Sequence, residues 1–328
     1  MTTARTVPVT TEMDGDELDA ADAWHVARRV GARRLLTDAF QRFRFGDGTT
    51  NSRALALQTA LAVLPFLLAL TGLATQLDQD GTAKVVAATI EAVSPGGGGA
   101  DALARAVSGN ESSEDAGEIA LGFGLVLGAL SLTVAMAQVE RGVNRLYGIE
   151  RDRAFLAKYG RSAVIAAAVA VPSAAAFLLL VAGQAFGEAM AQHAGWDDTT
   201  VGWWNVLRWP AGLVLSVLAI AGMLNHAPRR RQPGLSWLAL GGGLAVALSM
   251  SATGLLAAYV KVSGSFGQVY GPLAGVVALL LWALMASISL FYGAAVCAQL
   301  EACRAGVPDP VEDDPGRPDR AEVDDQVP

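Results

Sequence analysis

The sequence has little charge and very little lysine. Charged residues make up 17% of its 328 residues and hydrophobic residues 52%, whereas soluble globular domains contain about 25% charged residues. Lysine occurs only at Lys84, Lys158 and Lys261, so arginine supplies nearly all of the 24 basic residues. This composition excludes a soluble two-domain enzyme and a disordered protein.

The residue types that most often bind metals or act as nucleophiles are also scarce. The two cysteines, Cys297 and Cys303, suit neither a disulfide scaffold nor a usual metal site by their spacing. The three histidines, His25, His193 and His226, lie on different segments. No Walker motif, G-x-S-x-G or H-E-x-x-H sequence occurs. We therefore predict no catalytic, metal-binding or cofactor-binding residues, no soluble cofactor and no nucleic-acid partner.

Six long uncharged windows dominate the remaining sequence. Each has 19 or more residues, which is enough to cross a hydrocarbon core of about 30 Å at about 1.5 Å per residue. The last window, 262–300, is too long for one crossing and begins with a glycine-rich stretch before Pro272. We expect an external or re-entrant segment up to about Gly271, followed by a helix. The predicted spans are 54–77, 119–139, 162–187, 209–227, 233–260 and 272–300.

The basic residues fall on alternate flanks of these windows. Of the 24, 20 precede the first window, follow the sixth, or lie between the second and third or the fourth and fifth. Only helices or closed barrels satisfy the backbone in lipid, and the alternation of barrel strands is missing. Because basic residues are retained in the cytoplasm, the sequence predicts an all-α polytopic membrane protein with six transmembrane helices. Both termini are expected in the cytoplasm, and the expected location is the bacterial cytoplasmic (inner) membrane.

The segments outside the spans differ in composition. Residues 1–17 and the acidic tail 304–328 are expected to be disordered, and 78–118 is expected to be an external loop with short helices. Residues 18–53 combine arginines with Leu36, Phe40 and Phe43 at helical spacing. We expect a cytoplasmic amphipathic basic helix, which lies on the anionic leaflet or packs under the bundle. The membrane domain covers 54–303.

Polar residues in or near the spans are the candidate functional residues. Gln138, Glu140, Asn144 and Arg145 lie near the cytoplasmic end of the second span, and Gln268 lies in the glycine-rich stretch. These groups either hold helices together at about 0.6–2 kcal/mol each or line a polar path. The sequence leaves both alternatives open.

Four segments stand in a characteristic order and spacing. They are LPFLLAL around Pro65, VNRLYGIERDRAF at 143–155, HAPRRRQPGLSW at 226–237 and VYGPLAGVVALLLWALMASISLFYGA at 269–294. Together they resemble the YihY/BrkB family of bacterial inner-membrane proteins. The resemblance implies six helices with cytoplasmic ends, and for this family a role in envelope or lipid transport has been suggested. Where many members have Gly-Ala-Glu-Leu-Asn, this chain has Gly-Ala-Ala-Val-Cys at 293–297, so the intramembrane acid is missing. The positions carried over by motif are Pro65, Asn144, Tyr147, Pro228, Tyr270, Gly271 and Gly293.

These observations favour a transporter, or a protein that handles lipids or envelope components, with an unknown substrate. The alternative is a structural or accessory membrane protein that scaffolds an envelope complex. A ribonuclease, the activity in an old label of the family, is the least favoured because no ligand cluster for a catalytic metal is present. The expected partners are membrane lipids, and a homo-oligomer is left open.

Overall fold

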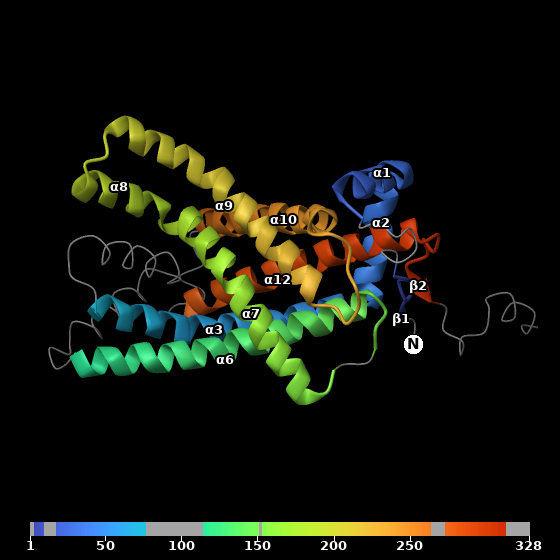
Figure 1. The fold of residues 1–328 in the computed structure, drawn as a ribbon, viewed down its shortest axis with the longest axis horizontal. Helices are drawn as coiled ribbons and strands as arrows, with labels where there is room; N and C mark the ends of the chain where they lie inside the picture. Colours follow the sequence, from blue (N-terminus) through green and yellow to red (C-terminus); the bar gives the residue numbers. More distant parts are fainter. Residues whose placement is uncertain (1–2, 10–17, 77–113, 151–152, 264–272, 313–328) are drawn as a thin grey trace, which may run out of the picture.

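The computed structural model of the chain is built almost entirely from helices (Figure 1). It describes residues 3–9, 18–76, 114–150, 153–263 and 273–312. Six of the helices are long and apolar enough to cross a membrane, which confirms the predicted all-α architecture with six transmembrane helices. The elements are β1 (Thr3–Ala4), α1 (Ala20–Val30), α2 (Ala32–Phe45), α3 (Gly48–Gln76), α6 (Glu114–Leu146), α7 (Phe155–Phe177), the π-helix η2 (Leu178–Ala182), α8 (Gly183–Ala194), α9 (Asp198–His226), α10 (Leu235–Ser263), α12 (Ala274–Arg304) and β2 (Val311–Glu312).

The long helices pack mainly against neighbours in the sequence, and α12 returns to α3. α3 lies along α6, α10 lies along α12, and α12 also packs against α3, while α9 contacts both α7 and α10. One end of the bundle collects the start of α3, the end of α6, the start of α7, the end of α9, the start of α10 and the end of α12 (Figure 1). We name it the terminal end, because both described chain termini lie there. The opposite end is the far end.

The short helices α1 and α2 pack across the terminal end. The capping box of Asp19 and Asp22 starts α1, and Gly31, with φ of 86°, separates α1 from α2. The prediction of one helix over 18–53 is therefore wrong, since the chain turns at Gly31 and α3 already begins at Gly48. Leu35, together with Ala23 and Ala39 on the same pair of helices, is buried in the core, so these helices pack under the bundle.

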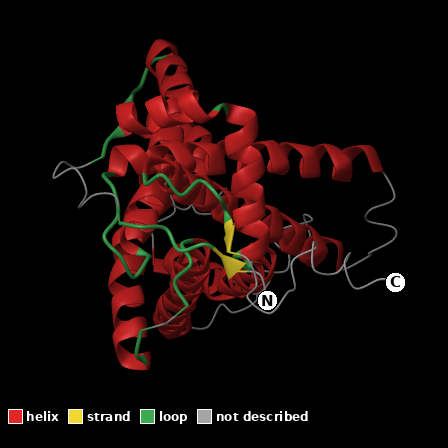
Figure 2. Cartoon of the chain, turned by 90° about the vertical axis from the view of Figure 1, so that its right-hand side faces the viewer, coloured by secondary structure: helices red, strands yellow, loops and turns green. Residues whose placement is uncertain are grey.

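Short strands join the two ends of the chain. β1 pairs antiparallel with β2, with Thr3 opposite Glu312 and Ala4 opposite Val311. Figure 2 looks onto the terminal end and shows the two strands near its middle, among the helix ends. Residues 3–9 and 305–312 are ordered there, although both were predicted to belong to disordered tails, because their backbone groups find partners in the bundle. The remaining residues of the predicted tails, 1–2, 10–17 and 313–328, lie outside the described residues, as does most of the predicted loop 78–118.

Most predicted spans coincide with one helix that extends beyond the span at one or both ends. The windows mark the uncharged stretch only, whereas the helices continue through polar turns at one or both ends; for example, α9 begins at Asp198 and not at the predicted residue 209. The third span starts earlier as well, at Phe155, and passes through η2 into α8. A π-helix inserts an extra residue into a turn and disturbs the regular ladder of backbone hydrogen bonds.

Candidate functional site

Charged side chains are buried at the terminal end of the bundle. In a chain with 17% charged residues, Arg42 and Glu301 are fully buried and Glu140 is 2% exposed. Removing a charge from water costs several kcal/mol unless it is paired and hydrogen-bonded. Each of these groups therefore needs partners, and we name the groups together with their side-chain partners the charged layer. Its members are Arg42, Glu140, Tyr147, Arg153, Ser162, Arg230, Gln299 and Glu301.

Glu301 on α12 is the centre of the charged layer. Arg230, from the connection between α9 and α10, donates from Nη2 to Glu301 Oε2 at 2.6 Å. The hydroxyl of Tyr147, which follows α6, donates to Oε1 at 3.0 Å. The guanidinium carbon of Arg230 also lies 4.7 Å from the centre of the Tyr147 ring, within the range of a cation–π contact. One carboxylate therefore joins three segments that are far apart in the sequence.

Tyr147 acts in this arrangement as a neutral donor. Burial raises the pKa of its hydroxyl well above its ordinary value, and the negative charge of Glu301 raises it further. Loss of the phenolic proton would place two negative charges together in a site with little water. The hydroxyl therefore keeps its proton and its hydrogen bond to Glu301 at neutral pH.

Arg42 on α2 is the second buried cation. Its Nε donates to Gln299 Oε1 at 2.9 Å, and its Nη1 donates to the carbonyl oxygens of Arg5 and Leu146 at 2.8 and 3.1 Å. Burial lowers the pKa of Arg42 to about 10, so the group is still charged at pH 7. Among the described residues no carboxylate lies within ion-pair distance of Arg42, and its Nη2 is buried without a partner.

Residues 3–9 form a strap across the charged layer. Carbonyl oxygens of the strap accept hydrogen bonds from both buried arginines: Arg5 accepts from Arg42, whereas Val7 and Pro8 each accept from Arg230 at 3.0 Å. The amide of Val7 donates to the carbonyl of Tyr147 at 3.2 Å. The strap thus contacts the charged layer through its backbone groups.

A second cluster of the charged layer surrounds Glu140 on α6. Arg153 Nη1 donates to Glu140 Oε2 at 2.8 Å, and the hydroxyl of Ser162 on α7 donates to Oε1 at 2.8 Å. Arg153 also donates to the carbonyl of Pro228 at 3.3 Å. Burial lowers the pKa of Arg153 and the neighbouring Arg161 lowers it further, while Glu140 raises it. This cluster ties α6 to α7 and to the connection after α9.

Replacing Glu140 by glutamine is expected to lower the free energy of unfolding by about 2 kcal/mol. The change keeps the shape but removes the counter-charge of Arg153, whose side chain is only 17% exposed. Thermal unfolding in detergent micelles measures the effect. The control is Glu150→Gln, an exposed acid ten positions later, which should change stability by less than about 0.5 kcal/mol. Equal effects of the two variants would contradict the assignment.

The structure brings several of the predicted site residues together at the terminal end. Gln138 donates to Asn51 Oδ1 at 2.8 Å, and the side-chain oxygen of Asn144 accepts from the amide of Arg229 at 2.7 Å. Glu140 and Tyr147 belong to the charged layer, and the carbonyl of Pro228 accepts a hydrogen bond from Arg153 of this layer. Pro65 lies inside α3 and Gly293 inside α12, away from the layer. Gln268, Tyr270 and Gly271 lie outside the described residues.

Three central residues of the layer were not among the predicted candidates. Arg42 and Arg230 were counted only as topology signals, and Glu301 directly follows the last window. A signal was available for Glu301, since it is a single acid between Leu300 and Ala302 near the end of an apolar helix. The family motif drew attention to a missing acid in this helix, although α12 carries a buried acid one to two turns later.

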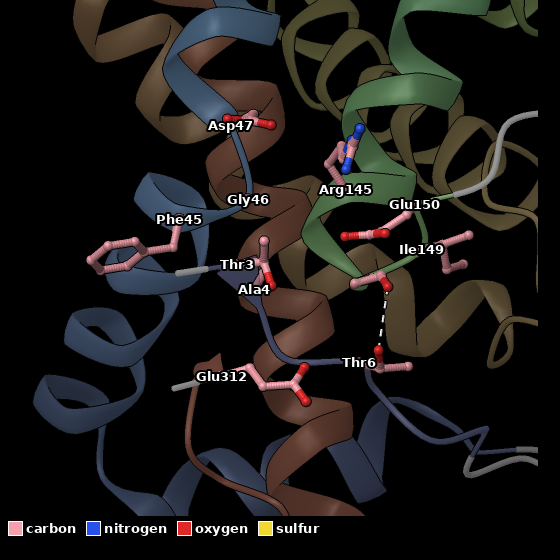
Figure 3. A pocket seen from close by; sticks show the side chains of 11 residues that line it. Thr3, Ala4, Thr6, Phe45, Gly46, Asp47, Arg145, Ile149, Glu150 and Glu312 are labelled. Atoms are coloured by element: carbon pink, nitrogen blue, oxygen red, sulfur yellow. Dashed lines mark hydrogen bonds between the residues drawn. The ribbon is translucent and has the colours of Figure 1, made fainter. Parts of the chain in front are cut away.

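A pocket of about 500 Å³ opens beside the strap (Figure 3). Arg145, the remaining predicted candidate, lines it together with the acids Asp47, Glu150 and Glu312. The hydroxyl of Thr6 donates to the carbonyl of Gly148 at 3.3 Å across one wall. In the described part of the chain, no three His, Cys, Asp or Glu residues lie close enough to hold a metal ion. The pocket is an open, mixed-charge surface.

Comparisons with known proteins cover most of the chain. The sequence model of the family described as Virulence factor BrkB matches residues 39–317. The ribonuclease-like protein YfkH of Bacillus subtilis (strain 168) is 23% identical over 275 residues, which are 84% of this chain and 98% of that protein. No solved structure matches the chain.

Proposed function

Because the chain belongs to the virulence factor BrkB family and carries six helices that can span a membrane, we propose that it is a multi-pass protein of the bacterial cytoplasmic membrane that transports or otherwise handles a lipid or envelope component. The membership confirms the family resemblance of the sequence. The six apolar helices make the chain a multi-pass membrane protein. The substrate class and the transport activity belong to the proposal.

The observation that carries the proposal is the difference between the two ends of the bundle. At the terminal end, the charged layer and the strap join α2, α6, α7 and α12 to the connection between α9 and α10. At the far end, α8 has extensive contacts only with η2 and α9, and Figure 1 shows α8 and α9 diverging from α3 and α6. This difference supports a transport role, because alternating access requires helices that move relative to one another around parts that stay joined.

The distribution of arginine supports a cytoplasmic position of the terminal end. The connection Arg229–Arg231, the end of α6 and the start of α7 all lie there and carry most of the basic residues near the spans. Basic connections are retained in the cytoplasm. In this orientation the charged layer lies on the cytoplasmic side of the bundle, and the far end faces the periplasm.

The test is lipid translocation in vesicles of phosphatidylethanolamine and phosphatidylglycerol, with a fluorescent lipid whose outer-leaflet fraction is quenched by dithionite. Wild-type protein should speed the exchange between leaflets above empty vesicles. In a variant without residues 3–9, Arg42 and Arg230 lose three carbonyl acceptors, so the terminal end loosens. This variant should raise the rate of lipid exchange about tenfold. A chain ending at Glu312 keeps the pairing of β1 with β2 and should exchange lipid as the wild type does.

Two outcomes would overturn the proposal. Exchange at the rate of empty vesicles for both the wild type and the strap-deleted variant would favour an accessory protein that scaffolds an envelope complex. Degradation of RNA by the purified protein, lost with the Glu301→Gln substitution, would favour the activity in the name of the Bacillus relative.

A further inference from the structure

A buried arginine that has no counter-charge among the described residues lies away from the charged layer. Arg208 is on α9, ten residues after the start of the helix at Asp198, and it is 9% exposed. Its stem packs on Gly183 at the start of α8, where a built Cβ would lie 2.9 Å from Arg208 Cδ. The absence of a side chain at this position makes room for the guanidinium group. Arg208 lies between the third and fourth predicted spans in the sequence, and the structure packs it against α8 and η2.

The guanidinium group of Arg208 has a hydrogen-bond donor that is not satisfied. Its Nη1 reaches the carbonyl of Leu179 in η2 at 3.5 Å, the limit of a hydrogen bond. Its Nε is buried without a partner, and its carbon lies 5.3 Å from the centre of the Trp209 ring. Among the described residues no carboxylate is within ion-pair distance of it; Glu188 on α8 instead accepts from Gln184 at 3.1 Å. A cation in this state favours an added anion.

An acceptor without a partner lies on the same face of α9. The side-chain oxygen of Asn205 is buried and has no hydrogen-bond partner. Asn205 precedes Arg208 by three positions, so the two side chains are neighbours on the helix surface. One donor and one acceptor, both buried and both without partners, therefore occur together. A ligand that satisfies both needs an anionic oxygen for Arg208 and a hydroxyl or ammonium group for Asn205.

The depth of this pair in the membrane follows from α9 itself. The 19 residues from Trp209 to Ala227 carry no formal charge and cover about 28 Å of helix, close to the thickness of a hydrocarbon core. Arg208 therefore lies at the boundary opposite the Arg229–Arg231 connection. Trp203 and Trp209 are 64% and 45% exposed, which is typical of side chains at the level of lipid headgroups. The anions at this level are phospholipid phosphates.

We propose that Arg208 and Asn205 form a binding site for a phospholipid headgroup at the far end of the bundle. The lipid phosphate accepts hydrogen bonds from the guanidinium group, and a hydroxyl or ammonium group of the head donates to Asn205 Oδ1. Trp204, whose Nε1 donates to the carbonyl of Gly183 at 2.6 Å, keeps α9 against α8 beside the site. In naming the substrate class this inference rests on the proposed function, but binding can be measured without transport.

The experiment is a calorimetric titration of the full-length protein in an uncharged maltoside detergent with dihexanoyl phosphatidylglycerol. Wild-type protein should bind it, and Arg208→Gln should weaken binding at least about tenfold, the loss expected for a charge-assisted hydrogen bond. Arg208→Lys keeps the charge but not the planar fork and should lose less. Arg44→Gln, which changes an exposed arginine at the terminal end, should bind as the wild type does.

Two further ligands distinguish the source of the anion. Dihexanoylglycerol, which lacks the phosphate, should not bind at this site, and inorganic phosphate should bind at least about tenfold more weakly than the lipid because it lacks the tails. Equal binding of inorganic phosphate and the lipid would overturn the proposal in favour of a free-anion site. Lipid translocation that is lost while lipid binding persists would count against the proposed transport and not against this site.

A second variant keeps the proposal testable if Arg208→Gln does not fold. Asn205→Asp places a carboxylate three positions before Arg208, where it can pair with the guanidinium group. The variant should therefore raise the melting temperature in detergent and weaken lipid binding at least about tenfold. Unchanged lipid affinity in Asn205→Asp, or in a folded Arg208→Gln, would overturn the assignment.

Discussion

Replacing Glu301 by alanine is expected to lower the free energy of unfolding by about 3–5 kcal/mol, the range measured when one partner of a buried ion pair is removed. The side chains of Arg230 and Glu301 are 5% and 0% exposed, so water does not replace the lost carboxylate. The hydroxyl of Tyr147 loses its acceptor at the same time. Reversible unfolding in mixed micelles, followed by circular dichroism, measures the change.

Two comparisons separate the ion pair from general damage to α12. Glu312→Ala removes an exposed acid of β2 and should change stability by less than about 0.5 kcal/mol. The double variant Glu301→Leu with Arg230→Met replaces both charges by apolar groups and should recover most of the loss, because no unpaired charge remains. If Glu301→Ala lowers the free energy of unfolding no more than Glu312→Ala does, the ion pair does not stabilise the bundle.

The transmembrane architecture could be predicted because two independent patterns agree. Long uncharged windows give the number of spans, and the alternation of arginine gives the flanks that lie together. The same alternation brings Glu140, Asn144, Tyr147 and Pro228 to one end of the bundle, and the structure places all four there. Their gathering follows from topology, since every second connection returns to the same side.

The centre of the charged layer could not be predicted in the same way. Arg42, Arg230 and Glu301 come from three distant segments, and their pairing depends on how α2 and α12 approach each other. Arginine has two uses in this chain, as a topology signal and as a buried hydrogen-bond donor, and the sequence pattern does not separate them. The strap binds through backbone carbonyls, which leave no side-chain signal.

For helix α2, the spacing of apolar residues predicts the helix correctly but not the face that packs on the bundle. The spacing of Leu36, Phe40 and Phe43 indicates a helix, and a helix is present. Only Phe43 of the three is buried; Leu36 and Phe40 are 39% and 54% exposed. The face that packs on the bundle instead contains Leu35 and Ala39 beside Arg42. Ala39 allows close packing on this face, while the exposed side chains of Leu36 and Phe40 are available for contact with lipid or another surface.

The last prediction concerns the contact between α10 and α12. Gly241→Ala is expected to lower the free energy of unfolding by about 3 kcal/mol, at the upper end of the usual cost of overpacking. The new Cβ would lie 2.5 Å from the carbonyl oxygen of Gly293 and would also collide with the sulfur of Cys297. Backbone atoms cannot move aside as a flexible side chain can, so the two helices must separate. Gly293→Ala should have a similar effect, since its Cβ would lie 2.9 Å from Ala245 Cβ.

The same helix supplies a matched control two residues away. At Gly243 a built Cβ meets nothing within 4 Å, so Gly243→Ala should be neutral or up to about 1 kcal/mol more stable, since alanine favours the helix. In micelles, the free energy of unfolding of Gly241→Ala should therefore be well below that of Gly243→Ala. Equal stability of the two would mean that α10 and α12 do not depend on the glycine contact. In that case the family position at Gly293 would have to act through something other than close packing. If stability falls in Gly241→Ala and Gly293→Ala but not in Gly243→Ala, the role of the motif position at Gly293 is to let two backbones approach closely within the membrane.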